Sequence, residues 1–294
     1  MKIPCDEYVL AYTVEEALAY LAEKRGAARI ISGGSDLLLE MQQGSCPPIE
    51  RLVDVTEIDE LCALEIKDSS LFIGAAVTLS RLKKSQLVLE HARALADAAE
   101  LMANPQVCNV ATIGGNVAHA LPAADGTVAL VALNAEAEVA NLAGRRRVAL
   151  PCLFTGPGES ALDACNDLLL GFYLPLCSEG QASAFSRRVN PQGIALAMLN
   201  LAIWLQREAE LIREARIAVG PAGPKPVRML AAEQALANQE FSPATLDHAL
   251  EELLREAHFR TSLHRATAGY RKHLAGILLQ EVFAKAWDRA ESTG

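Results

Sequence analysis

The stretch Ser32-Gly33-Gly34-Ser35-Asp36 follows a short apolar run at residues 28–31, and the stretch Thr112-Ile113-Gly114-Gly115-Asn116 carries a second Gly-Gly pair. Glycine lacks a Cβ atom and adopts positive φ at little cost, so paired glycines let several backbone N–H groups converge on one anion. An apolar strand, a glycine turn and an apolar segment are the layout of a phosphate-binding loop. The two loops together predict a site for an extended anion such as a diphosphate.

The first loop departs from two better-known phosphate motifs. No third glycine completes a G-x-G-x-x-G fingerprint, and no Gly-Lys-Ser/Thr follows as it does in a P-loop. A single Gly-Gly pair is also common in ordinary tight turns. The hypothesis therefore depends on both loops and their flanking residues.

The second loop lies within residues 104–125, a string that resembles the FAD-binding subunits of the molybdenum hydroxylases. This is the family of the xanthine dehydrogenase flavin subunit and the carbon monoxide dehydrogenase medium subunit. The resemblance runs nearly end to end, because further matching islands occur in the same order at residues 52–55, 71–78, 154–158, 215–220, 226–228 and 269–271.

The resemblance implies an α+β chain. Its first part is expected to be a two-subdomain FAD-binding fold of the vanillyl-alcohol-oxidase/PCMH type, and a C-terminal domain of a small antiparallel sheet plus helices follows. We expect FAD-binding subdomain 1 at residues 1–58, subdomain 2 at 59–177 and the C-terminal α+β domain at 178–294.

The spacing of apolar residues predicts the individual elements. Thr13 and Glu16 form a capping-box pattern that begins a helix over 13–25. Further helices are expected over 79–82 and 87–102 and from Arg228, Pro243 and Ser262 onward. Strands are expected at 28–31, 52–55, 61–66, 71–77, 135–140, 147–150, 168–174, 184–187, 194–205 and 210–219.

The resemblance also implies a binding site for FAD between the first two units. Its diphosphate is expected on the backbone amides of residues 32–36 and 114–116, with side-chain hydrogen bonds from Thr112 and Asn116. Asp125 matches a position that contacts ribose or adenine, although capping a helix is an alternative role. The expected cofactor-binding residues are Ile30, Ile31, Ser32, Gly33, Gly34, Ser35, Asp36, Leu37, Met102, Thr112, Gly114, Gly115, Asn116, Asp125, Leu169 and Ser186.

Three positions depart from the family pattern, and alternatives remain for two others. Cys108 stands where relatives usually carry Arg, Ser186 where they carry Lys or Arg, and Gly193 where they carry Asp. These changes concern contacts around the flavin and to partner subunits more than FAD binding itself. Core packing is the alternative for Met102, and a structural hydrogen bond is the alternative to a flavin contact for His119.

Composition excludes several function classes. The chain has 294 residues and a net charge of −9, which disfavours nucleic acid as a partner. No apolar stretch approaches the roughly 20 residues of a membrane span, and the N-terminus lacks a signal-peptide core, so we expect a cytoplasmic protein.

Seven cysteines without a C-x-x-C pair predict free thiols and no bound metal. The basic cluster at 145–147 is expected in a hairpin turn, either solvated or in contact with a subunit or nucleotide.

No Ser-His-Asp triad, carboxylate pair or zinc pattern stands out, so we expect no catalytic residue for substrate oxidation. The resemblance implies an electron-transfer subunit. Electrons from a molybdopterin subunit would pass through an iron–sulfur subunit to FAD, and then to NAD⁺ or another acceptor. Two alternatives remain at this stage: a stand-alone FAD-dependent oxidoreductase of the related fold, and a flavin-free scaffold subunit.

Overall fold

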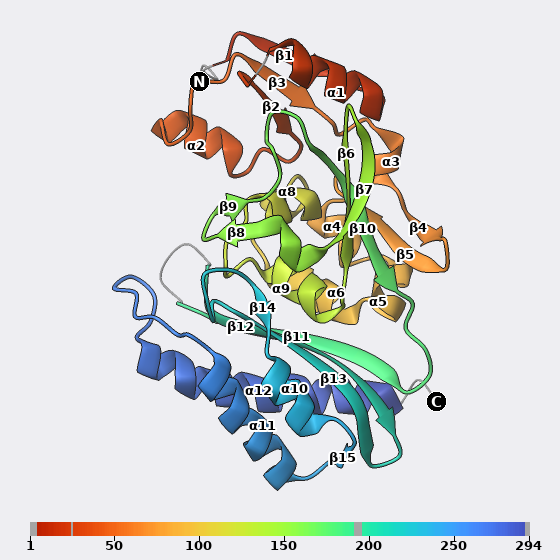
Figure 1. The fold of residues 1–294 in the computed structure, drawn as a ribbon, viewed down its shortest axis with the longest axis vertical. Coiled ribbons are helices and arrows are strands. Elements are labelled where there is room, and N and C mark those ends of the chain that lie inside the picture. The colour runs from red at the N-terminus through yellow and green to blue at the C-terminus, as the bar shows by residue number, and fades with distance from the viewer. Residues whose placement is uncertain (1–4, 25, 191–195, 292–294) are drawn as a thin grey trace.

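The computed structural model describes residues 5–24, 26–190 and 196–291 (Figure 1). Its N-terminal part is a three-stranded parallel sheet in the order β1-β3-β2, formed by β1 (Glu7–Leu10), β2 (Ala28–Ile31) and β3 (Arg51–Asp54). Helix α1 (Val14–Glu23) joins β1 to β2, and α2 (Leu37–Gln43) follows the first glycine loop. The expected helix start is confirmed, because the Thr13 hydroxyl accepts a hydrogen bond from the Glu16 N–H at 3.1 Å.

The second part is a five-stranded antiparallel sheet in the order β4-β5-β10-β6-β7. Its strands are β4 (Leu64–Lys67), β5 (Ser70–Gly74), β6 (Glu136–Asn141), β7 (Gly144–Ala149) and β10 (Leu168–Pro175). The helices of this part are α3 (Asp59–Cys62), α4 (Leu79–Leu82), α5 (Gln86–His91), α6 (Arg93–Leu101), α7 (Pro105–Cys108), α8 (Ile113–Ala118) and α9 (Asp125–Ala132). A 3₁₀ turn, η1 (Leu150–Leu153), leads into the short pair β8 (Phe154–Gly156) and β9 (Glu159–Ser160).

The C-terminal part is an antiparallel sheet in the order β11-β12-β13-β14, with β15 also paired to β13. The strands are β11 (Gln181–Val189), β12 (Ala197–Glu208), β13 (Leu211–Gly220), β14 (Val227–Arg228) and β15 (Gln239–Glu240). The helices are α10 (Leu230–Leu236), α11 (Pro243–Glu256) and α12 (Ala268–Glu291). Helix α12 packs on one side of this sheet and α6 and α9 pack on the other, so the sheet is a middle layer (Figure 1).

Buried side chains join the three parts. Every residue of α9 is buried, because it lies between the helices of the second part and the C-terminal sheet. One apolar core extends from the second part to Phe185, Ala202 and Trp204 of that sheet. Another joins the first part to Leu168 and Leu170 of β10, so the mixed α+β fold with its C-terminal sheet and helices matches the prediction.

The structure differs from the expected elements at several points. Residues 61–66 are split between the end of α3 and β4, and the helix expected over 87–102 is broken at Ala92, whose φ of −140° and ψ of 45° are not helical. The last helix begins at Ala268 rather than Ser262, and the strand start expected at Ile194 lies outside the described residues, as does Gly193.

The basic cluster at 145–147 lies in strand β7 rather than in the hairpin turn, so that expectation was wrong. Each of its guanidinium groups pairs with a carboxylate of the same chain, and the partners of Arg145, Arg146 and Arg147 are Glu60, Asp167 and Asp68. Strand β7 is the edge strand of its sheet, where charged side chains discourage pairing with another chain.

Candidate functional site

Two adjoining cavities lie where the first and second parts of the chain meet. Their volumes are about 220 Å³ and about 350 Å³. Both are lined by residues of β2 and the loop after it, and by residues of the second glycine loop and α8. The residues common to both linings are Arg29, Ile30, Ser32, Thr112, Gly115, Ala118 and Ala164.

The first glycine loop, residues 32–36, offers unused hydrogen-bond donors to these cavities. None of its five backbone N–H groups donates to another residue in the described parts of the chain. The Ser32 hydroxyl oxygen is buried and has no partner there either. Buried polar atoms of native proteins are nearly always satisfied, so this loop is shaped for a group that brings acceptors.

Both glycines of this loop are required by its geometry. A Cβ atom on Gly33 would lie 2.2 Å from the carbonyl oxygen of Val110, which is far inside van der Waals contact. Gly34 has a φ of +66°, in the left-handed region that side-chain-bearing residues seldom adopt. The close approach of Gly33 to Val110 also places the first loop directly against the chain that leads into the second.

The second glycine loop is arranged differently, because its amides already have partners. The N–H groups of Ile113 and Gly114 donate to the carbonyl oxygens of Val77 and Ala75 at 3.1 Å and 2.8 Å. Those of Gly115 and Asn116 donate to the hydroxyl and carbonyl oxygens of Thr112 at 3.2 Å and 3.1 Å. The amides of residues 114–116 are therefore not the free diphosphate donors that the sequence suggested.

Side chains of the second loop also make internal contacts. The Asn116 carboxamide oxygen accepts a hydrogen bond from the Thr127 N–H at 3.1 Å, and its Nδ2 lies 3.8 Å from the sulfur of Met102. A Cβ on Gly114 would lie 2.5 Å from the Ala75 carbonyl oxygen, so glycine is needed for this backbone to dock. The loop thus supplies a closely packed wall to the cavities.

Thirteen of the sixteen expected site residues line at least one cavity. They are Ile30, Ile31, Ser32, Gly33, Gly34, Ser35, Asp36, Leu37, Thr112, Gly114, Gly115, Asn116 and Leu169. Met102, Asp125 and Ser186 line neither cavity. The linings also contain residues outside these sixteen, among them Arg29, Glu40, Ala75, Ala76, Ala111, Ala118 and Ala164, and His119, for which the sequence had left a flavin contact open.

Asp125 is buried at the junction with the C-terminal sheet. Its carboxylate accepts hydrogen bonds from the guanidinium of Arg187 at 2.6 Å and from the side-chain amide of Asn200 at 2.5 Å. Burial raises the pKa of Asp125 above its ordinary value. The charge of Arg187 and the two hydrogen bonds lower the pKa, but by less than burial raises it. The residue before it, Ala124, is the N-cap of α9, so the alternative role of Asp125 as a helix cap is not observed.

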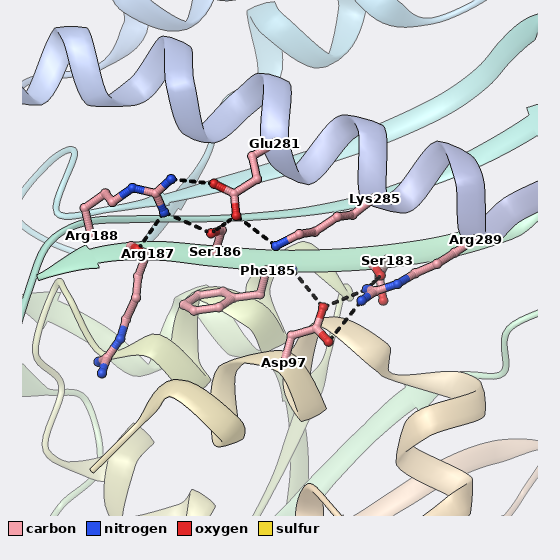
Figure 2. A network of polar contacts seen from close by, with 9 residues as sticks. All are labelled: Asp97, Ser183, Phe185, Ser186, Arg187, Arg188, Glu281, Lys285 and Arg289. Atoms are coloured by element: carbon pink, nitrogen blue, oxygen red, sulfur yellow. Dashed lines mark hydrogen bonds and ion pairs between the residues drawn. The ribbon is translucent and has the colours of Figure 1, made fainter. Parts of the chain in front are cut away.

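Ser186 faces away from the cavities because of its position in β11. Successive side chains of a strand point to opposite faces, and Figure 2 shows Ser186 and Arg188 on the side of α12 and Phe185 and Arg187 on the other. The Ser186 hydroxyl donates to Glu281 of α12 at 2.8 Å.

Arg187 is the cation that β11 directs toward the second part of the chain. It binds Asp125 and also donates to the carbonyl oxygen of Leu101 at the end of α6. The period-two alternation along β11 was a signal in the sequence that identifies Arg187, rather than Ser186, as the inward-facing residue.

A second polar network holds the C-terminal helix to the second part of the chain (Figure 2). Arg289 of α12 donates to the carboxylate of Asp97 on α6 at 2.6 Å and to the carbonyl oxygen of Ser183 at 2.7 Å. Asp97 also accepts from the N–H of Phe185 at 3.4 Å. Helix α6, strand β11 and helix α12 are thereby fixed in one arrangement.

Taken together, these features fit a cofactor with a diphosphate and flat rings. The first loop offers free N–H groups and a buried unpartnered hydroxyl, which suit phosphate oxygens. The smaller cavity also has apolar walls from Val55, Leu61, Leu168 and Leu169, which suit an aromatic ring. The fold and the two cavities fit a protein that binds an extended nucleotide cofactor.

Comparison with known proteins identifies the family. The model for the FAD binding domain in molybdopterin dehydrogenase matches residues 4–177, and that for the CO dehydrogenase flavoprotein C-terminal domain matches residues 184–286. The nicotine 6-hydroxylase medium subunit of Paenarthrobacter nicotinovorans is 30% identical over 98% of this chain and 100% of its own. The xanthine dehydrogenase FAD-binding subunit of Escherichia coli O157:H7 is 29% identical over 95% of each chain.

A solved structure agrees with these matches. A chain of carbon monoxide dehydrogenase from Hydrogenophaga pseudoflava superposes with a TM-score of 0.91, at 28% identity, over 98% of this chain and 99% of that one. This chain belongs to the family of FAD-binding medium subunits of the molybdenum hydroxylases. It is an FAD-binding subunit of an oxidoreductase, so the predicted family, fold and cofactor are confirmed.

Proposed function

We propose that this subunit receives electrons from iron–sulfur clusters of a partner subunit and passes them, through its FAD, to NAD⁺ or another acceptor. Oxidation of the organic substrate then takes place on a molybdopterin subunit of the same complex. Bound FAD supplies the redox chemistry, and the protein supplies binding, orientation and electrostatics. In the described residues no group of three or more His, Cys, Asp or Glu side chains could hold a metal ion, and no helix is long and apolar enough to cross a membrane.

The observation that carries the FAD site, on which the proposed electron transfer depends, is the unpartnered, buried hydroxyl of Ser32 beside the free amides of the first loop. These donors have no use within the described chain, and a diphosphate provides the acceptors that they lack. We infer that Ser32 and the amides of residues 32–36 bind the diphosphate, while the second loop and Leu169 provide the packed wall against which the cofactor lies.

The names of the relatives support the proposed partners. The E. coli relative is called a subunit and the P. nicotinovorans relative a medium subunit, which are names for parts of larger assemblies. A stand-alone flavin oxidoreductase would instead need its own substrate base. The ionisable side chains of the cavity linings are Arg29, Asp36, Glu40, Cys46, His119 and Asp167, and our proposal gives none of them the role of a substrate base.

FAD binding at this site is tested with the purified chain, titrated with FAD and followed by its visible spectrum. We expect flavin bands and about one FAD per chain for the natural sequence, and loss of both for Gly33→Ala, whose Cβ would collide with Val110. Gly223→Ala is a matched control, because a Cβ there meets only one atom, at 3.7 Å. A folded Gly33→Ala variant with full FAD content would contradict the site.

The acceptor is tested on the FAD-loaded chain without oxygen. Bleaching of the flavin band by NADH supports NAD⁺ as the acceptor, because the transfer is then shown in reverse. Bleaching by dithionite but not by NADH argues against NAD⁺ as the acceptor. The proposed relay itself fails if the chain, purified with FAD and without any partner, turns over an organic substrate.

A further inference from the structure

The N-terminal end of α12 and the segment before it, residues 257–267, carry three arginines with different exposure. Arg260 and Arg265 are exposed, whereas Arg271, in the first turn of α12, is only 1% exposed. Arg271 is the first of the largest fully buried side chains in the described part of the protein. Arg271 is also the last residue of the family-like island at 269–271, and none of these three residues lines the cavities of the FAD site.

Arg271 is buried without a polar partner. Its Nε and Nη1 atoms make no hydrogen bond with any described residue. An arginine side chain stays charged in proteins, and a buried charge is unfavourable unless it is paired. The other inward-facing arginines do have partners, since Arg187 pairs with Asp125 at 2.6 Å and Arg228 pairs with Glu233 at 2.6 Å.

The electrostatic surroundings of Arg271 add to this imbalance. Burial lowers the pKa of its guanidinium, and the positive charges of Arg265 and Arg260 lower it further. The first turn of a 24-residue helix contributes a positive partial charge at the same place.

We propose that Arg271, at the N-terminal end of α12, forms a binding site for an oxyanion, either a phosphate or a carboxylate group, with Arg260 and Arg265 at its rim. A planar guanidinium donates two parallel hydrogen bonds to such a group, and the anion neutralises a charge that the chain leaves unpaired. The site is separate from the cofactor cleft, since none of these arginines lines the two cavities.

The oxyanion has two conceivable sources with the same chemistry. One is a dissolved anion, and the other is an acidic side chain of another subunit. Apolar groups beside the site suit the second source, because Leu263 is 97% exposed and Tyr270 is 47% exposed. Such exposed apolar side chains next to charged ones are typical of protein interfaces.

The site is tested by thermal unfolding of the full chain in sodium phosphate and in sodium chloride of the same ionic strength. We expect phosphate to raise the Tm of the natural chain by about 2–5 °C more than that of Arg271→Met. In chloride, Arg271→Met is expected to unfold at the same or a higher temperature than the natural chain, because it removes an unpaired buried charge. Arg228→Met is the matched control and should lower the Tm, because the buried carboxylate of Glu233 then loses its cation and keeps only the hydrogen bond from the Ile217 N–H.

A double variant, Arg260→Ala with Arg265→Ala, keeps the test valid if Arg271→Met does not fold. Both residues are exposed, so folding should be retained while the phosphate-dependent rise in Tm falls by at least half. Equal responses of the natural chain and the variants to phosphate would overturn the proposal, and so would a fall in Tm for Arg271→Met as large as that for Arg228→Met.

The source is distinguished in the assembled complex. Loss of the phosphate response there, with the response retained in the isolated chain, assigns the site to a carboxylate of a partner subunit. A response retained in both assigns it to a dissolved anion. FAD content is measured in the same samples and should be unchanged by Arg271→Met, so a failure of this proposal remains distinct from a failure of the flavin site.

Discussion

The two glycine loops look alike in sequence and do different things in the structure. In residues 32–36 the backbone N–H groups and the Ser32 hydroxyl have no partner in the described chain. In residues 113–116 each N–H group is bonded to Val77, Ala75 or Thr112. Glycine serves both loops for the same steric reason, but one uses it to leave donors open and the other to bring two stretches of backbone into contact. The Gly-Gly pattern shared by the two loops therefore predicts that something packs closely against the backbone. Whether that is a ligand or another segment of the chain follows only from the hydrogen-bond partners of the loop.

The largest effect is expected where the chain beyond the second loop joins the C-terminal sheet. Arg187→Met leaves the buried carboxylate of Asp125 with only Asn200 as a partner. We expect the free energy of unfolding to fall by about 3–5 kcal/mol, as for other broken buried pairs. Urea unfolding of the FAD-free chain measures it, with Arg213→Met as a control at an exposed ion pair. An unchanged urea midpoint would show that the ion pair between Arg187 and Asp125 does not stabilise the fold.

The next effect tests the second loop directly. Gly114→Ala places a Cβ 2.5 Å from the Ala75 carbonyl oxygen, and the Cα and Cβ atoms of Ala75 are also closer than 3 Å, so one of the two backbone segments must shift. We expect a loss of about 1–3 kcal/mol of unfolding free energy in the absence of FAD. The comparison between the loops breaks down if Gly114→Ala unfolds like the natural chain and loses only FAD affinity.

A pH-dependent effect tests whether Ser186 belongs to the scaffold rather than to the cofactor site. Burial raises the pKa of Glu281, but hydrogen bonds from Lys285, Ser186 and Arg188 outweigh it and lower the pKa to about 2 from 4.5. Because the folded-state pKa is depressed, the stabilisation is complete above pH 4.5 and is lost as the pH falls toward 2.

Glu281→Gln should therefore flatten the acid limb of the stability curve. The expected difference, allowing for partial exposure of the side chain, is on the order of 1–2 kcal/mol. It is measured as the unfolding midpoint against pH between 6 and 3, values that span the upper part of this titration. Identical curves for the variant and the natural chain would argue against the role given to Ser186 and Glu281.

The smallest effect tests the first loop. Ser32→Ala removes one donor to the diphosphate and one unpartnered buried hydroxyl, so FAD affinity should fall by about tenfold, or about 1.4 kcal/mol. The unfolding free energy of the FAD-free chain should stay the same or rise slightly. Equilibrium titration with FAD measures the first change, and urea unfolding measures the second. A clear loss of stability without a loss of affinity would place Ser32 among the structural residues.

Much of this architecture was predictable from the sequence because it depends on local rules. The Thr13 cap, the strand before the first loop and the glycine positions were all visible as short-range patterns. The hydrogen-bond partners of the second loop were not, since Ala75 and Val77 lie far from it in sequence. The break at Ala92 and the pairing of Asp125 with Arg187 likewise depend on tertiary contacts that propensity does not encode.

Ser186 shows how alignment and strand geometry differ as sources of prediction. The family resemblance pointed to this position, but the pleat of β11 turns its side chain to α12 and gives the inward-facing place to Arg187. An alignment gives the position of a residue in the sequence. The alternation of side chains along the strand then determines the face of the sheet on which that side chain lies.

The open donors of the first loop have a consequence for the lifetime of the protein in a cell. A chain that has not yet bound its flavin carries a buried hydroxyl and a set of amides without an acceptor among the described residues. A ligand that binds only the folded state raises the population of that state, so flavin supply sets how often this subunit unfolds and meets a protease. The abundance of the whole enzyme would then follow the availability of the vitamin from which its flavin is made.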